Sequence, residues 1–121
     1  MKIKKVKIGL KDIKTSLNDF VKSGEAIKKG EIVKKEKSVY FTSLEAFRKA
    51  ITSPRLELLR TIKEKNPSSI NRLAQDLNRN IKNVSDDVSY LAQIGLIETR
   101  KTNKEVPPYV EYDKILLEIT V

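Results

Sequence analysis

Apolar side chains recur along this sequence with two spacings, one typical of strands and one typical of helices. Residues 2–8 alternate lysine with isoleucine and valine, which predicts a short strand with Val6 and Ile8 on one face. From Leu10 to Ile27, apolar residues recur every three or four positions, as on one face of a helix. Residues 31–38 are highly charged and predict a loop, and residues 38–41 favour a second short strand.

Three helix-start signals follow in the middle of the chain, and the helices below are counted from the first of these signals. Residues 42–45 fit a capping box, in which the Thr42 hydroxyl and the Glu45 side chain each satisfy a free backbone N–H. Ser53 and Pro54 fit the cap and the first position of a second helix, and Ser68 or Ser69 begins a third. The apolar positions expected to be buried on these helices are Leu44, Phe47, Ile51, Leu56, Leu59, Ile62, Ile70, Leu73, Ala74 and Leu77.

A fourth helix is expected after a tight turn at residues 78–80, with Asn80 as its cap and Gly95 at its end. Residues 96–100 and 109–112 then predict two strands joined by a polar loop, and residues 115–121 alternate like a final strand. The expected core positions of the fourth helix are Ile81, Val84, Val88 and Leu91.

The order of elements from Ser53 to Tyr112 is that of a winged helix-turn-helix: helix, short helix, turn, longer helix, strand, loop, strand. We therefore expect an α+β protein, a winged helix-turn-helix with an N-terminal strand-helix extension and a C-terminal strand. Residues 1–41 are assigned to the extension, for dimerisation or partner binding, and residues 42–121 to a DNA-binding domain.

Short motifs follow one another in a fixed order and spacing along the chain, at residues 29–31, 43–47, 52–59, 67–70, 73–74, 79–84, 87–88, 91, 95–97 and 108–115. In the order and spacing of these motifs the sequence resembles the MarR/ArsR-like winged-helix regulators, and among these a family of small prokaryotic predicted regulators. The resemblance covers nearly the whole chain. It implies DNA binding and transcriptional control, as a dimer.

The composition excludes several other functions. The chain has no cysteine and no histidine, which excludes disulfides, zinc fingers, histidine-based triads and cysteine nucleophiles. We expect no catalytic residue, no cofactor and no metal site. No apolar run approaches the roughly 18 residues of a membrane span, and the cytoplasm is the expected location.

The positive charge lies mainly in the first half of the sequence. The net charge is +9, of which residues 1–52 carry +8 and residues 53–121 carry +1. The excess near the N-terminus comes from Lys2, Lys4, Lys5, Lys7, Lys11 and Lys14. These lysines predict phosphate contacts beside a DNA duplex, a surface for an acidic protein, or simply a solvated lysine-rich surface, and the sequence does not rank the first two.

The residues expected to contact DNA lie on the fourth helix and in the wing. On that helix, the face opposite the core positions centres on Lys82, Asp86 and Tyr90. Arginine and lysine can contact guanine, asparagine can contact adenine, and Asp86 can accept from cytosine or pair with Lys82. Asp87 is expected to pair with a basic side chain elsewhere in the domain. The candidates are Arg79, Asn80, Lys82, Asn83, Ser85, Asp86 and Ser89, with Arg100, Lys101 and Lys104 in the wing.

The expected partners are therefore double-stranded DNA and a second copy of the chain, because operators are commonly two-fold symmetric. Either the helix from Leu10 to Ile27 or the last strand would form the dimer interface. The alternative is a protein-interaction module, such as the antitoxin of a toxin-antitoxin pair, with an acidic protein partner. RNA is disfavoured because the four tyrosines are scattered and form no stacking platform.

Overall fold

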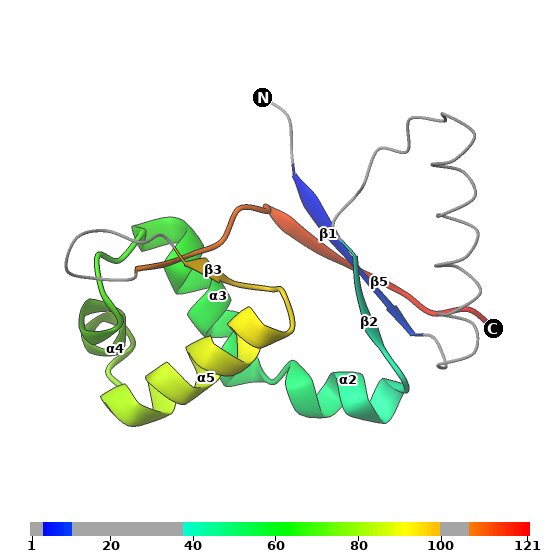
Figure 1. The fold of residues 1–121 in the computed structure, drawn as a ribbon, viewed down its shortest axis with the longest axis horizontal. Helices are drawn as coiled ribbons and strands as arrows, with labels where there is room; N and C mark the ends of the chain where they lie inside the picture. The colour runs from blue at the N-terminus through cyan, green and yellow to red at the C-terminus, as the bar shows by residue number, and fades with distance from the viewer. Residues whose placement is uncertain (1–3, 11–37, 100–106) are drawn as a thin grey trace. The chain divides into compact units, whose positions relative to one another are not determined.

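The computed structural model describes residues 4–10, 38–99 and 107–121 and has both helices and strands, so the chain is an α+β protein (Figure 1). Its internal contacts divide it into two units. The first, called here the sheet unit, combines residues 1–50 with residues 114–121, and the second, the helical unit, is residues 51–113. Within the described residues, no helix is both long enough and apolar enough to cross a membrane.

A parallel sheet organises the first unit. β1 (Lys5–Leu10) lies between β2 (Ser38–Phe41) and β5 (Lys114–Glu118), and both neighbours run parallel to it. Val6 and Ile8 are fully buried, which confirms the predicted face of the first strand. Leu10 belongs to β1 and not to the helix predicted to follow it; residues 11–37, which hold the rest of that helix and most of the predicted loop, lie outside the described residues.

Helix α2 (Leu44–Ala50) begins one residue later than the predicted capping box. The Ser43 hydroxyl accepts the hydrogen bond from the backbone N–H of Ala46 at 3.0 Å, so Ser43 is the cap and Thr42 is not. Glu45 instead lies 3.6 Å from the Lys49 ammonium, one turn along the helix. Both Thr42 and Ser43 have a hydroxyl that can cap a helix. In the helix that begins after Ser43, Phe47 lies edge-on against Phe41 of β2, with ring centroids 5.8 Å apart.

The helical unit contains α3 (Ser53–Lys65), α4 (Ile70–Leu77) and α5 (Ile81–Gln93), followed by the antiparallel pair β3 (Glu98–Thr99) and β4 (Pro108–Tyr109). Two predictions for α3 are wrong by a small shift. Thr52, not Ser53, caps it, and Leu58 is buried where Leu56 was expected. The other two expected core positions of α3, Leu59 and Ile62, are buried. The largest fully buried side chains of this unit are Leu58, Ile62, Leu73, Val84, Leu91, Leu96 and Pro108.

Left-handed backbone conformations end all three helices. Asn66 has a φ of 44° and Asn78 a φ of 53°, and asparagine tolerates this region better than most residues. Gly95 has a φ of 93°, and the N–H of Leu96 then donates to the Leu91 carbonyl at 2.8 Å. The two leucines are buried at this helix end, which places the following strand against the core.

The segment after β4 returns to the helical unit through two side chains. The Tyr112 hydroxyl donates to the Leu96 carbonyl at 2.8 Å, and burial raises the pKa of this phenol above its usual value. Lys63 on α3 donates to the Glu111 carbonyl at 3.2 Å and lies 3.1 Å from an Asp113 carboxylate oxygen. Residues 111–113 are therefore anchored to α3 and to the end of α5.

This division differs from the domains expected from the sequence. The expected boundary fell after residue 41, with the last strand in the second domain, whereas α2 and β5 share their contacts with the sheet unit. The reason is pairing between the two ends of the chain, because β5 forms a ladder with β1 from Lys5 opposite Lys114 to Gly9 opposite Glu118. The predicted final strand also stops at Glu118, so Ile119 and Val121 lie beyond it and are exposed.

Candidate functional site

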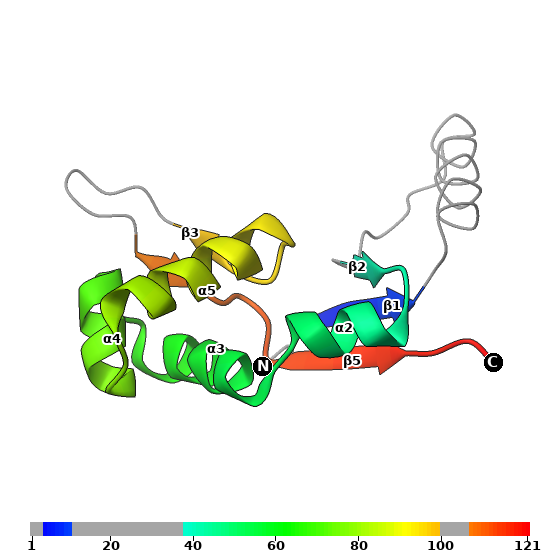
Figure 2. The same cartoon turned by 90° about the horizontal axis from the view of Figure 1, so that it is seen from below.

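Helix α5 carries a polar stripe opposite its buried face. Val84, Val88 and Leu91 are buried against the rest of the helical unit, in which α3, α4 and α5 pack together (Figure 2). Ile81 was expected in the core but is 46% exposed, because it sits in the first turn, beyond the end of the packed face. The exposed polar side chains of α5 are Lys82, Asn83, Asp86, Ser89 and Gln93, and Ser85 is half-buried at the edge of the stripe.

The N-terminus of α5 is capped by Asn80, as predicted. Its Oδ1 accepts hydrogen bonds from the backbone N–H of Lys82 at 2.8 Å and of Asn83 at 3.4 Å. Asn80 itself is exposed. The side-chain oxygen is therefore committed to the helix, while the amide nitrogen remains at the surface beside the exposed first turn of α5.

Asp87 pairs with basic side chains of its own unit, as expected, and it pairs with two. Its Oδ2 lies 2.8 Å from Nη2 of Arg79, and its Oδ1 accepts from Nε of Arg55 at 3.1 Å. All three side chains are mostly buried, with exposed fractions of 16% for Asp87, 22% for Arg55 and 28% for Arg79. We call these three residues the Asp87 cluster; it ties α3, the α4–α5 turn and α5 together.

The Asp87 cluster engages two residues near the predicted DNA-contacting face, Arg79 and Tyr90. Arg79 is held against Asp87, and its Nη1 is buried without a hydrogen-bond partner among the described residues. Tyr90 was placed at the centre of that face, yet the Arg55 guanidinium covers its ring at 4.3 Å from the centroid. Both side chains therefore have partners inside the unit, which the spacing along a single helix does not reveal.

The exposed stripe holds one cation and one anion close to its start. Lys82 and Asp86 are one turn apart, but in the described part of the chain no ion pair joins them, contrary to the pairing considered from the sequence. Arg72 on α4 has a side chain 64% exposed and lies 3.6 Å from Asp76. The polar stripe of α5 itself presents amide, hydroxyl, ammonium and carboxylate groups to solvent.

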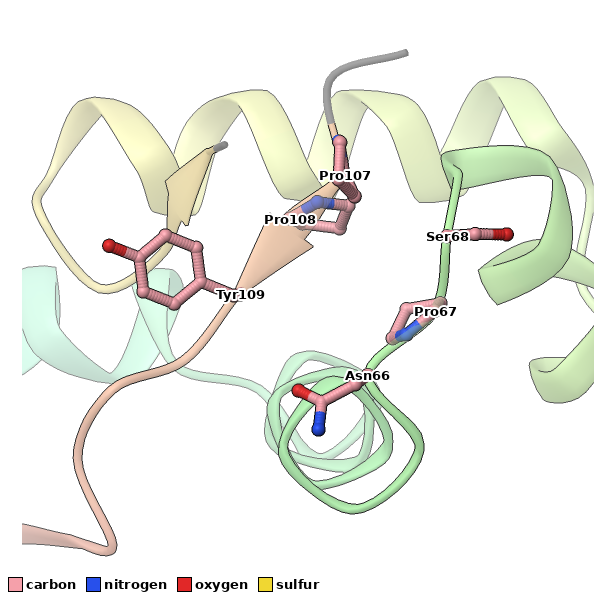
Figure 3. A pocket seen from close by; sticks show the side chains of 6 residues that line it. All are labelled: Asn66, Pro67, Ser68, Pro107, Pro108 and Tyr109. Atoms are coloured by element: carbon pink, nitrogen blue, oxygen red, sulfur yellow. The ribbon is translucent and has the colours of Figure 1, made fainter. Parts of the chain in front are cut away.

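The predicted wing falls between β3 and β4. Arg100, Lys101 and Lys104 lie outside the described residues. Beside the hairpin is a hollow of about 340 Å³, and its walls come from the α3–α4 connection and from the start of β4 (Figure 3). Sequence patterns do not predict this hollow, because its two walls lie about forty residues apart in the chain. Its lining residues are Asn66, Pro67, Ser68, Pro107, Pro108 and Tyr109.

The described residues contain no group of three or more acidic side chains placed to hold a metal ion. The hollow beside the hairpin has no charged lining residue, and Asp87 is occupied by two arginines. The exposed polar face of α5 brings together four of the sequence-predicted site residues, Lys82, Asn83, Asp86 and Ser89, and is the candidate site considered below.

These features define a small α+β protein with a three-helix unit, a short hairpin and an exposed polar face on its last helix. The chain belongs to the HVO_A0114 family, whose model matches residues 50–117. The matched stretch begins one residue before the helical unit and extends into β5. A search of the curated proteins finds no match to this sequence.

Proposed function

We propose that residues 51–113 act as a winged helix-turn-helix of the MarR/ArsR-like kind, and that the protein binds double-stranded DNA in the cytoplasm as a dimeric transcriptional repressor or autoregulator. In this proposal α4 and α5 form the helix-turn-helix, with α5 as the recognition helix. The β3–β4 hairpin is the wing.

The observation that carries the proposal is the two-sided character of α5. One face is buried through Val84, Val88 and Leu91, while the other leaves Lys82, Asp86 and other polar side chains in solvent along the whole helix. A helix held firmly on one side and polar on the other fits the major groove of DNA, where polar side chains meet base edges. The tight turn before it, with Asn78 left-handed and Asn80 capping, fixes its direction relative to α4.

The geometry suggests separate roles for the candidate residues. Lys82 and Asn83 reach from the first turn and are assigned to base edges, with Asp86 accepting from cytosine on the same face. Asn80 presents its amide nitrogen beside the helix N-terminus, which favours a phosphate. Arg79 is assigned a supporting role through Asp87, and Ser85 and Ser89 flank the contact. Arg100, Lys101 and Lys104 of the wing are assigned to the DNA backbone.

The charge distribution supports a contribution from the sheet unit. Residues 53–121 carry a net charge of only +1, against +8 for residues 1–52. Since phosphate neutralisation supplies much of the affinity for DNA, the lysines of the first half are assigned to this task. The same imbalance favours the second candidate function, in which the protein is an antitoxin or similar module whose lysine-rich half binds an acidic protein.

The experiment is a binding measurement on the purified full chain, with DNA from upstream of its own coding sequence and random DNA of equal length, at two salt concentrations. A specific regulator prefers its own DNA by about a thousandfold and keeps that preference at the higher salt. Equal and salt-sensitive binding to both DNAs would contradict sequence-specific regulation. Absence of binding would favour the acidic-protein partner.

A further inference from the structure

The outer edge of β5 is an apolar strand edge with no described partner. In the sheet order β2-β1-β5, one side of β5 pairs with β1 and no described strand pairs with the other. Leu116 is 45% exposed and Leu117 is 41% exposed, although successive strand residues point to opposite faces. An exposed apolar edge of this kind is a template for pairing with another strand.

The hydrogen-bonding phase of β5 follows from its pairing with β1. The N–H of Lys114 donates to the Lys4 carbonyl at 3.3 Å, so the backbone of Lys114 faces β1. In a parallel ladder alternate residues face the same neighbour, so Leu116 and Glu118 also face β1. The backbone N–H and C=O groups of Ile115 and Leu117 therefore face the outer edge.

The sequence of β5, Lys-Ile-Leu-Leu-Glu, is complementary to itself when two copies run antiparallel. With a two-fold axis through Leu116, Lys114 lies opposite Glu118 of the other copy, at both ends of the ladder. Ile115 lies opposite Leu117, and Leu116 lies opposite itself. Opposite residues share a face of the sheet, so each apolar side chain meets an apolar one and each charge meets its opposite.

The same two-fold axis also brings together the backbone groups that face the outer edge of β5. Ile115 and Leu117, whose backbone groups face outward, are opposite each other and can exchange both of their hydrogen bonds. Leu116 and the charged pairs then occupy the non-hydrogen-bonded positions, where Cα atoms approach to about 4.5 Å and side chains are closest. An axis through Leu117 would instead set Leu116 opposite Glu118.

We propose that two copies of the chain pair through their β5 edges, antiparallel about Leu116, and so join their sheets into one continuous sheet. The pairing extends the proposed function, because a two-fold operator needs two helical units, but the pairing itself does not require DNA. Glu118 already lies 2.6 Å from the Lys7 ammonium of its own chain, and its side chain is 58% exposed. In the dimer its carboxylate would lie between this lysine and the second copy's Lys114.

The test uses charge exchange in the full-length protein, measured by sedimentation equilibrium from micromolar to submillimolar concentration. Lys114→Glu places two carboxylates opposite each other at both ends of the ladder, and the dimer dissociation constant should rise by at least about tenfold. Glu118→Lys should do the same with two ammonium groups. When the two variants are mixed, both pairs become complementary, and a mixed dimer should form with nearly the affinity of the unmodified chain.

Two further variants complete the design. Leu117→Pro removes an N–H that faces only the outer edge, so it should also weaken the dimer while β1 pairing persists. Lys49→Glu makes the same charge change on α2, which packs on β2 at the opposite edge of the sheet, and should leave the dimer unchanged. Thermal melts establish that each variant is folded.

The results separate this inference from the proposed function. Recovery of the dimer on mixing supports the β5 pairing whether or not DNA binds. A chain that is monomeric throughout the concentration range, or a dimer unaffected by Lys114→Glu and Leu117→Pro, would overturn it. A β5 dimer without any DNA preference would instead contradict the proposed function alone.

Discussion

Asp87→Ala removes the carboxylate that holds two arginines beside the turn between α4 and α5. In the intact protein Asp87 lies 2.8 Å from Arg79 and 3.1 Å from Arg55. Without it, two like-charged guanidinium groups remain close together at sites that are about three-quarters buried, and Arg79 already has one nitrogen without a partner among the described residues. The variant should destabilise the helical unit.

The magnitude follows from burial. Breaking a fully buried ion pair by removing one partner costs about 3–5 kcal/mol. The exposed fractions of 16% to 28% in the Asp87 cluster admit some solvent screening, so we expect a loss of about 2 kcal/mol in the free energy of unfolding. For a unit of this size, such a loss corresponds to a decrease in melting temperature of roughly 8–16 °C.

The assay is thermal and urea unfolding followed by circular dichroism. Asp76→Ala is the matched control, because Asp76 is similarly covered, at 14% exposed, but its partner Arg72 is 64% exposed and can be solvated alone. That control should change the free energy of unfolding by less than about 0.5 kcal/mol. Asp87→Asn, which keeps a hydrogen-bond acceptor without the charge, should fall between the two. Equal losses for Asp87→Ala and Asp76→Ala would refute this account of the Asp87 cluster.

Three other changes test individual contacts. Asn80→Asp should keep the cap of α5 and leave the melting temperature of the protein unchanged, but it should weaken the proposed DNA binding severalfold because the carboxylate repels phosphate. Asn80→Ala should instead cost about 1 kcal/mol of stability. If the Asp variant is stable and binds DNA with unchanged affinity, capping is the role of Asn80 and a DNA contact is not. Gly95→Ala should cost about 1–2 kcal/mol in urea unfolding, because a φ of 93° is strained for alanine, and an unchanged midpoint would contradict this. Above about pH 10 the Tyr112 phenol loses its proton in the unfolded chain before it does so in the folded protein, so the stability of the protein should fall as the pH rises. The stability of Tyr112→Phe should fall less steeply in thermal melts over the same pH range. A parallel fall for both proteins would contradict the raised pKa of Tyr112.

Local signals in the sequence were sufficient to predict most of the helices and turns of the helical unit. The turn at residues 78–80, the cap at Asn80 and the stop at Gly95 are confirmed, because each depends on residues adjacent in the chain. The caps at Ser43 and Thr52 were each missed by one residue, since a serine and a threonine stand side by side at both places and either hydroxyl can cap a helix.

Long-range partners could not be predicted from periodicity. The ladder between β1 and β5 joins residues more than a hundred positions apart, and the sequence of neither strand indicates which strand it pairs with. The sequence indicated that Asp87 would find a basic partner, but not that it would engage both Arg55 and Arg79 and so hold Arg79 within the unit. The polar stripe of α5 was largely predicted, because burial on one face follows from the helical period; Tyr90 was misplaced because its cover comes from α3.

If the exposed face of α5 is the proposed DNA-reading surface, it distinguishes one DNA sequence from another. Selection from a pool of random double-stranded DNA tests this with the unmodified chain and with a Lys82→Ala, Asn83→Ala variant, and Lys65→Ala serves as a control at an exposed lysine of α3. We expect an enriched motif with the unmodified chain and the control, and loss of that motif in the double variant with a much smaller change in its affinity for random DNA. Enrichment of the same motif by the double variant, or of no motif by the unmodified chain, would show that α5 does not read the DNA sequence.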